Sequence, residues 1–339
     1  MNKFNQIINN KFNSSIPFNY MCENFLKDLS DCIMIDKEAR KYTDLISFAF
    51  WIRKKNLSKL KNNLLKNNLN IKIGLGLVFH ISPANVPINF AYSFIFGLVT
   101  GNANIVRLPS KNFEQSKIFL KIYNKISNLK KYKEIKNNNY FVNYDSADFE
   151  VTKKFSQIAD VRIIWGGDET INEIKKYSSK LKNRDIFFSD RFSLAVLNFK
   201  NFNLLTKNEV QKLAENFYND IFFMDQNACT SPHIVIWVGG HNKKSDKELF
   251  WKNISEIAKK KYQLDHVISI TKMSDLFSDI NKLKNVKNTK NYNNFLIRVE
   301  IDKIDNDIEK YNKRFGYIYE YNSKNLDIDK LFNNKKIQT

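Results

Sequence analysis

Apolar residues along the chain occur in two patterns that alternate. Short apolar runs between glycine, proline or asparagine predict strands, whereas apolar residues spaced three or four apart predict helices with one buried face. From residue 71 to residue 198 the two patterns follow one another regularly. We predict strands at 71–81, 103–108, 140–144, 161–165, 185–188 and 193–198, and helices at 88–99, 113–129, 149–158 and 168–178.

Parts of the remaining chain show the same two patterns of apolar residues. Residues 204–224 and 247–262 predict helices, and 233–238, 295–301 and 317–321 predict strands. Residues 281–294 are rich in lysine and asparagine and predict only a connection. The polar segment before residue 71 has apolar positions that fit helices near 25–35 and 45–51, and no internal repeat is found.

A strand, a helix and a strand within about forty residues form a βαβ unit, which implies a parallel sheet. The pattern therefore predicts an α/β protein. A chain of 339 residues, of which 43% are hydrophobic, is long enough for two domains with their own cores.

The net charge of +20 raises the possibility of a nucleic-acid-binding protein. Most lysines, however, are scattered among asparagines, and no Arg-rich helix or platform of basic and aromatic residues is found. We therefore expect no specific nucleic-acid partner and a basic surface that attracts anionic ligands, including phosphorylated cofactors.

The cysteines and histidines exclude several kinds of site. Three cysteines, at 22, 32 and 229, have neither zinc-site nor disulfide spacing, which favours a reducing cytoplasm. The four histidines are not clustered, so no metal is expected. The first 19 residues lack a secretory h-region, and the longest apolar run, 86–100, is too short for a membrane span.

Three junctions carry residues suited to chemistry. Cys229 lies in a polar helix-to-strand junction, where a nucleophile would be exposed and a buried structural cysteine is not expected; an inert loop cysteine is the alternative. Asn85 lies in a Pro-x-Asn-x-Pro turn and offers two N–H donors. Gly166 and Gly167 precede a helix, whose N-terminus favours phosphate. A cysteine facing an amide donor is suited to acyl chemistry, because the donor holds the developing oxyanion.

Four motifs, taken jointly and in order, resemble the aldehyde dehydrogenase superfamily. They are GLVFHISPANVP at 76–87, LVTGNANIVRLPS at 98–110, IWGG at 164–167 and QNAC at 226–229. Within the superfamily they are most similar to the acyl-CoA reductase branch, which includes the fatty-acid reductase of bacterial bioluminescence. The resemblance covers about residues 70–240 and continues faintly to 314–316.

The resemblance implies an aldehyde-dehydrogenase-like α/β fold with a Rossmann-like cofactor domain and a second α/β catalytic domain. We expect N-terminal helices and the dinucleotide-binding domain at 1–198 and the catalytic domain, with the nucleophilic cysteine, at 199–312. Residues 313–339 are expected to return toward the cofactor domain. The chain is shorter than typical relatives, and the projecting hairpin through which they oligomerise is not identified, so a homo-oligomer stays an open alternative.

The same resemblance implies roles for individual residues. Cys229 would accept the acyl group, and Asn85 would share the oxyanion hole with the backbone N–H of Cys229. Arg107 stands where relatives usually have a lysine that contacts the adenosine ribose, and its guanidinium suits a 2′-phosphate, which favours NADPH over NADH. The implied cofactor-binding residues are Ser82, Pro83, Ala84, Arg107, Ser110, Gly166 and Gly167.

One departure from the superfamily bears on the reaction. Aldehyde-oxidising relatives have a Glu-Leu-Gly-Gly motif whose glutamate activates water, whereas residues 187–193 here read FFSDRFS, with Asp190 as the nearest carboxylate. Without that base an acyl-cysteine should persist until it accepts hydride. We therefore predict NAD(P)H-dependent reduction of an acyl thioester to an aldehyde, with acyl-CoA or an acyl group from a partner enzyme as substrate. The alternatives are aldehyde oxidation and a non-catalytic basic scaffold of the same fold.

Overall fold

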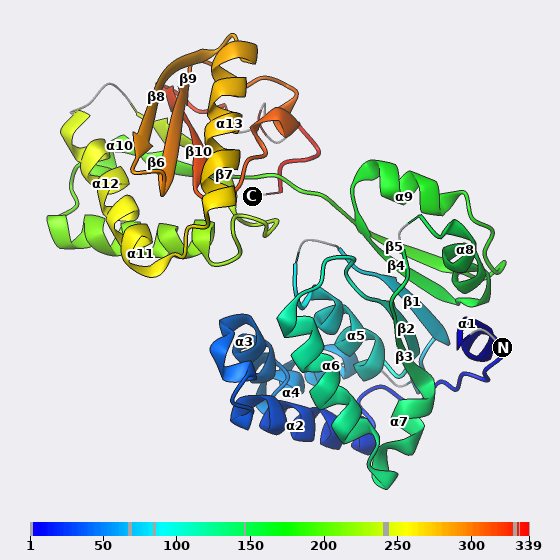
Figure 1. Ribbon diagram of the computed structural model, residues 1–339. Coiled ribbons are helices and arrows are strands. Elements are labelled where there is room, and N and C mark those ends of the chain that lie inside the picture. Colours follow the sequence, from blue (N-terminus) through cyan, green and yellow to red (C-terminus); the bar gives the residue numbers. More distant parts are fainter. Residues whose placement is uncertain are drawn as a thin grey trace. The chain divides into compact units, whose positions relative to one another are not determined.

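The computed structural model describes residues 3–66, 70–83, 86–145, 147–239, 244–327, 331 and 333–338. The chain forms two compact units, Met1–Ser189 and Asp190–Thr339, and each is built around a five-stranded sheet (Figure 1). We predicted a boundary after residue 198 and a separate segment 313–339. The structure instead has one division, at 189/190, and residues 193–198 and 317–323 are strands of the second sheet.

The sheet of the first unit is parallel throughout. Its strands are β1 (Leu77–Ile81), β2 (Ala103–Arg107), β3 (Asn139–Val142), β4 (Val161–Gly166) and β5 (Arg184–Ser189), in the order β3-β2-β1-β4-β5. This confirms the parallel sheet that the βαβ pattern predicts. The order reverses direction between β1 and β4, and in such sheets ligands bind beyond the carboxyl ends of the strands at that point.

Helices cover both faces of this sheet. On one face α2 (Tyr20–Ile35), α3 (Thr43–Trp51), α4 (Lys54–Leu65), α5 (Asn89–Val99), α6 (Glu114–Ser127) and α7 (Lys133–Asn138) contribute to a single core. On the other face are α1 (Lys3–Ile8), α8 (Phe149–Ile158) and α9 (Asp168–Lys175). Short 3₁₀ turns lie at Ala39–Lys41 and Lys130–Tyr132.

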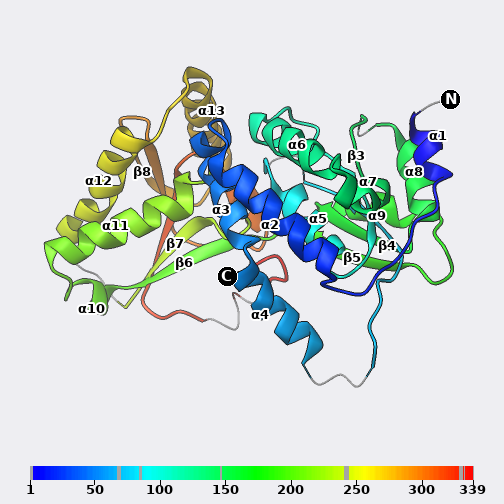
Figure 2. The same cartoon turned by 90° about the horizontal axis from the view of Figure 1, so that it is seen from below.

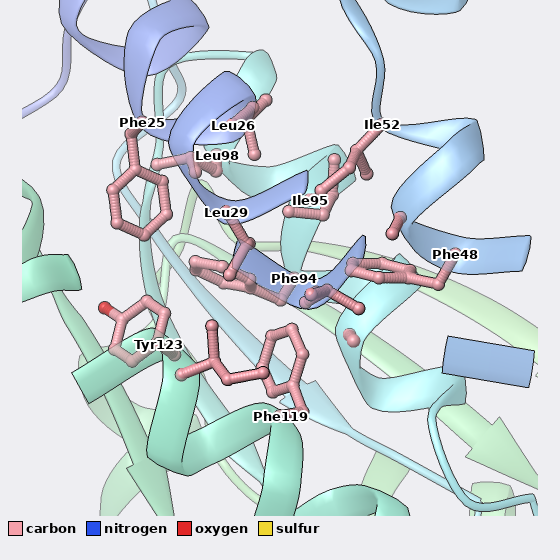
Figure 3. Close-up of a cluster of buried hydrophobic side chains, with 14 of the residues drawn as sticks. Phe25, Leu26, Leu29, Phe48, Ile52, Phe94, Ile95, Leu98, Phe119 and Tyr123 are labelled. Carbon is pink, nitrogen blue, oxygen red and sulfur yellow. The ribbon is translucent and has the colours of Figure 1, made fainter. Parts of the chain in front are cut away.

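The N-terminal helices join the first unit because their apolar residues lie on one side. In α2, Phe25, Leu26, Leu29 and Ile33 recur at helical spacing and are completely buried, and Asn19 caps the helix by accepting from the Cys22 N–H at 2.8 Å. Figure 3 shows α2 side chains packed among residues of α3, α5 and α6, and Figures 1 and 2 both place α2 beside α5 and α6.

The first predicted strand, 71–81, is shorter in the structure. Ile71, Ile73 and Leu75 are exposed, and β1 begins only after Gly76, whose φ is +132°. At this point the Leu77 N–H donates to the Asp160 carboxylate at 2.8 Å, and a Cβ on Gly76 would lie 2.2 Å from that carboxylate. The chain enters the sheet only where glycine permits this close approach.

The second unit is also an α/β sandwich. Its sheet has the order β6-β7-β10-β9-β8, parallel except for the edge strand β8. The strands are β6 (Ser193–Asn198), β7 (Pro232–Val238), β8 (Val286–Tyr292), β9 (Leu296–Ile301) and β10 (Tyr317–Ser323). The helices are α10 (Phe199–Phe202), α11 (Lys207–Phe222), α12 (Lys244–Lys261) and α13 (His266–Lys282), with a 3₁₀ turn at Ile308–Tyr311.

Helices α10, α11 and α12 pack on one face of this sheet and α13 on the other. Figures 1 and 2 both show α11 and α12 side by side. The prediction missed α13 and β8. The sequence signal failed for β8 because an edge strand with mostly exposed side chains needs few apolar residues, so its lysines and asparagines predict a connection.

Within the described part of the chain, no helix is both long and apolar enough to span a bilayer.

Candidate active site

Cys229 lies in a tight loop between α11 and β7. Asp225 and Gln226 have φ of 53° and 61°, in the left-handed region that non-glycine residues rarely adopt. The backbone then turns back, with the Ser231 N–H donating to the Ala228 carbonyl at 2.9 Å. The Cys229 side chain is exposed, as the sequence predicted for a nucleophile, whereas Cys22 is buried.

The buried side chain of Gln226 fastens this loop to the sheet. Its Nε2 donates to the carbonyls of Pro232 at 3.0 Å and Tyr317 at 3.1 Å. Its Oε1 accepts from the N–H groups of Gly316 at 3.0 Å and Tyr317 at 3.2 Å. Both halves of the amide are therefore satisfied, at the start of two adjacent strands. Gln226 belongs to the cysteine motif at 226–229, but nothing in the sequence assigned it a role.

Further contacts hold the backbone on either side of the thiol. The Ser193 hydroxyl donates to the Cys229 carbonyl at 2.6 Å, and the Ser231 hydroxyl donates to the Asp220 carbonyl at 2.7 Å. Two positions before the cysteine, the Asn227 amide donates to the Met224 carbonyl at 3.1 Å, while its Oδ1 is buried without a partner among the described residues. The exposed thiol is thus carried by a backbone with little freedom.

The histidine nearest to Cys229 in sequence is not placed as a base. His233 is buried at the start of β7, with its ring 5.1 Å from that of Phe192. Burial lowers its pKa to about 4, with a smaller opposing effect of a hydrogen bond to the Lys313 backbone, so the ring is neutral near pH 7.

The predicted cofactor-binding residues lie in the first unit, at the carboxyl edge of its sheet. Strand register pairs Ile81 with Arg107 on one side and with Ile164 on the other. Ser82 therefore begins the loop after β1 at the same edge where β2 and β4 end. The Ser82 Oγ is buried and has no partner among the described residues. Pro83 follows it, whereas Ala84 and Asn85 lie outside the described residues.

Gly166 ends β4, and Gly167 is the N-cap of α9. Because Gly167 has no side chain, it cannot cap the first N–H groups of the helix, which leaves them suited to an anion. A Cβ on Gly166 would lie 3.2 Å from the side chain of Thr170, so the turn is also closely packed.

Arg107 and Ser110 lie beyond β2. The Arg107 guanidinium stacks over the ring of Tyr144 at 4.8 Å, which fixes the planar cation at the sheet edge. Ser110 is exposed in the bend three residues later. Tyr144 could not be identified from the sequence as the residue that positions Arg107, because the two are 37 residues apart.

His80 lies inside the first unit in a continuous chain of hydrogen bonds. Its Nδ1 lies 2.8 Å from Ser93 Oγ, and its Nε2 lies 2.9 Å from Asn104 Oδ1. Asn104 Nδ2 donates to Asn139 Oδ1 at 2.6 Å, so Asn104 Oδ1 is left to accept from His80 Nε2–H. Complete burial lowers the His80 pKa to about 4. His80 is therefore a core residue with both ring nitrogens in hydrogen bonds.

The segment FFSDRFS at 187–193 runs from the end of β5 to the first residue of β6. Phe188, in β5, stacks on Trp165 with ring centroids 4.0 Å apart, and Asp190 is exposed just after the strand. Within the described residues, no three His, Cys, Asp or Glu side chains are grouped to hold a metal ion. The predicted cofactor-binding positions thus belong to the first unit and Cys229 to the second.

Comparison with solved structures identifies the fold. Betaine aldehyde dehydrogenase from Staphylococcus aureus, solved with NAD⁺, has a TM-score of 0.60 and 14% identity, covering 90% of this chain and 66% of that one. An NAD-dependent aldehyde dehydrogenase from Sinorhizobium meliloti has a TM-score of 0.62 and 10% identity, covering 90% of this chain and 65% of that one. These similarities confirm the predicted aldehyde-dehydrogenase-like fold.

Sequence comparison identifies the family. A long-chain acyl-protein thioester reductase from Aliivibrio fischeri is 25% identical over 165 residues, which are 48% of this chain and only 32% of that protein. The matched region thus spans about a third of the relative. The family described as acyl-CoA reductase (LuxC) matches residues 30–290, which is most of the chain. The chain therefore belongs to the acyl-CoA reductase (LuxC) family.

Proposed function

We propose that this protein reduces an acyl thioester to an aldehyde, with a nicotinamide nucleotide as reductant and Cys229 as the acyl carrier. The observation that carries the proposal is the exposed thiol of Cys229 on a loop held by Gln226 and Ser193. A loop with two left-handed residues, held to the sheet by four hydrogen bonds of the buried Gln226 side chain, is a costly structure for an inert cysteine.

The residues of the second unit supply the acyl transfer. The Cys229 sulfur attacks the acyl carbonyl carbon, a new C–S bond forms, and the bond to the departing thiol breaks as that thiol takes up the proton. The Cys229 backbone N–H lies in the fixed loop, where it can donate to the carbonyl oxygen as negative charge develops. The Ser193 hydroxyl holds the next peptide unit, Cys229–Thr230, by its carbonyl, which limits the movement of the loop that carries this N–H.

The first unit would hold the nucleotide. The orphaned Ser82 hydroxyl and the uncapped turn at Gly167 provide a donor and an anion site at the carboxyl edge, and Arg107 provides a fixed cation. When bound, the reduced nucleotide supplies a hydride, the two electrons that turn an acyl group into an aldehyde. Arg107 suits a 2′-phosphate, so we propose NADPH as the preferred form.

Cys229 also has to release the product. After reduction the acyl carbon is joined to its sulfur as a thiohemiacetal, and when that C–S bond breaks the aldehyde leaves and the thiol is restored. Hydrolysis of the acyl-enzyme is slow because FFSDRFS at 187–193 has no glutamate to activate water. Asn85, from its position in the motif at 76–87, is proposed as the second oxyanion donor.

The substrate is proposed to be a long-chain acyl group, because the relative from Aliivibrio fischeri is named for a long-chain acyl-protein thioester. The donor is either acyl-CoA or an acylated partner enzyme that transfers its acyl group to Cys229.

The experiment combines product analysis with mass spectrometry. The full chain is incubated with tetradecanoyl-CoA, first without and then with NADPH. We expect an acyl adduct without NADPH, and fatty aldehyde with loss of the adduct when NADPH is added. Cys229→Ala should abolish both, whereas Cys32→Ala, at a half-buried cysteine of the other unit, should change neither.

Two results would contradict the proposal. One is fatty acid formed from aldehyde and NADP⁺ with no aldehyde formed from any acyl thioester, which would indicate the oxidising direction. The other is an adduct that persists in Cys229→Ala, because it would place the acyl carrier elsewhere. An acylated carrier protein in place of tetradecanoyl-CoA distinguishes a protein-bound donor from CoA.

A further inference from the structure

Three aromatic rings lie at the surface formed by the end of α3 and by α5. Phe50 is exposed by 56% and Phe96 by 48%. Trp51 is half-buried, and its ring centroid lies 5.4 Å from that of Phe96. Figure 3 shows Phe48 and Ile52, the nearest core residues on either side in the chain, among the completely buried side chains. The core of the first unit is therefore closed without Phe50 and Phe96, which face outward.

Three consecutive basic residues follow these rings at the start of α4. Arg53 is the N-cap of the helix, Lys54 and Lys55 are its first two residues, and all three are exposed. The Arg53 guanidinium lies 5.0 Å from the centre of the Phe50 ring, so the cations adjoin the rings in space as well as in sequence. Among the residues that the structure describes, none of the three forms an ion pair. We call this set of residues the corner patch: Phe50, Trp51, Arg53, Lys54, Lys55 and Phe96.

The stretch of chain that forms the corner patch carries no acidic residue. Between Asp44 and Glu114 there is neither Asp nor Glu, whereas the same stretch has nine lysines and arginines. Asp44 itself is buried. From Leu45 onward, α3, α4 and α5 therefore contribute only cations to the surface charge. A surface with exposed rings and cations without ion pairs is complementary to a partner that is both anionic and apolar.

An anionic lipid bilayer is a partner of this kind. Phenylalanine and tryptophan rings enter its headgroup region, and lysine and arginine side chains beside them reach the lipid phosphates. A nucleic acid fits less well, because the rings of Trp51 and Phe96 are inclined by 59° to each other and form no platform on which bases stack. We propose that the corner patch binds the anionic surface of a bilayer, with Phe50 and Phe96 in the headgroup region and the three basic residues on the phosphates.

This contact with the bilayer is peripheral. The other faces of α3 and α4 are fixed in the core, where Phe48 and Leu57 are buried, so only the exposed rings leave the water. A long-chain aldehyde, the product of the proposed reaction, partitions into the same bilayer. The inference does not depend on that reaction, because lipid binding is measured without acyl donor or nucleotide, and either can fail alone.

Flotation of the full chain with lipid vesicles tests the proposal. We expect salt-sensitive binding to vesicles of equal parts phosphatidylcholine and phosphatidylglycerol, and at least about tenfold weaker binding to phosphatidylcholine alone. The triple variant Arg53→Gln, Lys54→Gln, Lys55→Gln should weaken binding about a hundredfold, because each cation near an anionic surface contributes roughly fivefold. The matched control replaces the three exposed lysines at 259–261, at the end of α12, by glutamine and should weaken binding less than about threefold.

A second variant, Phe50→Ser, tests the aromatic part of the corner patch. It should weaken vesicle binding about tenfold, because there is no longer a ring at this position that leaves the water on binding. The matched control is Phe149→Ser, which makes the same change at a phenylalanine exposed by 54% elsewhere in the first unit and should leave binding unchanged. Circular dichroism confirms that each variant is folded.

Three results would overturn the proposal. One is a chain that does not float with the anionic vesicles. Another is an equal loss of binding in the triple variant and in the lysine control, which would indicate unspecific attraction of a chain with a net charge of +20. The third is vesicle binding that Phe50→Ser leaves unchanged. Binding of a single-stranded oligonucleotide, or self-association, that Phe50→Ser weakens in its place would assign the corner patch to another partner.

Discussion

The most informative perturbation is the replacement of Gln226 by leucine, which keeps the volume of the side chain and removes its amide. Four buried hydrogen bonds, to Pro232, Gly316 and both backbone groups of Tyr317, are lost together. At about 1 kcal/mol net for each bond, the loss is about 4 kcal/mol, and the backbone groups left unpaired add to it. A typical domain is stable by only about 5–15 kcal/mol.

Hydrogen exchange of the β7 and β10 amides measures this effect locally. For amides that exchange through unfolding of this part of the sheet, a loss of about 4 kcal/mol makes exchange faster by roughly a thousandfold. Acylation of Cys229 should slow in parallel, since its loop loses its attachment to the sheet. The control is Gln157→Leu, at an exposed glutamine with one hydrogen bond, to Ser178, where less than about 0.5 kcal/mol is expected. If Gln226→Leu changes the exchange rates of the β7 and β10 amides as little as Gln157→Leu does, the reasoning is refuted.

Three further changes test other parts of the molecule. The pKa of His80 is about 4 in the folded protein and 6.5 in the unfolded chain. As the pH falls, the His80 ring is therefore protonated in the unfolded chain before it is protonated in the folded protein. The first unit should therefore keep its full stability above about pH 6.5 and lose up to about 3 kcal/mol between pH 6.5 and 4, and urea unfolding of His80→Gln should lack this loss. Arg107→Leu should reduce the preference for NADPH over NADH at least about tenfold in kcat/KM, and an unchanged ratio would exclude a 2′-phosphate contact. Asn85→Ala should lower the rate of aldehyde formation by about a hundredfold if Asn85 is an oxyanion donor. Stopped-flow measurement of NADPH consumption checks this, and an unchanged rate would contradict that role.

Much of the fold could be predicted because local chemistry decides it. Strands β1, β2 and β4 are short apolar runs between helices with one apolar face, and such alternation permits only a parallel sheet. Helix α13 could not be predicted in the same way. Four of its apolar residues are exposed, while Lys272 and Asp279 are buried beside Leu276, and the sequence alone does not tell which side of a helix will meet a sheet.

In the candidate site, too, some residues could be predicted from the sequence and others could not. Cys229, Asn85 and the two glycines at 166–167 stand out because their residue types suit a chemistry and lie at junctions, and the order of their motifs resembles that of a known family. The residues that hold the Cys229 loop could not be found from the sequence, because they and their hydrogen-bond partners lie far apart along the chain. Gln226 bonds to Tyr317, 91 residues away, and Ser193 bonds to Cys229 across 36 residues.

The sequence by itself therefore determined the α/β class, the exposure of one cysteine and the family to which the chain belongs. Each of these depends on residue type and local spacing. Only the tertiary structure decided where the chain divides, which strand of the second sheet is antiparallel, and how the loop of Cys229 is held. These depend on backbone hydrogen bonds and buried polar side chains, whose partners become neighbours only after the chain has folded.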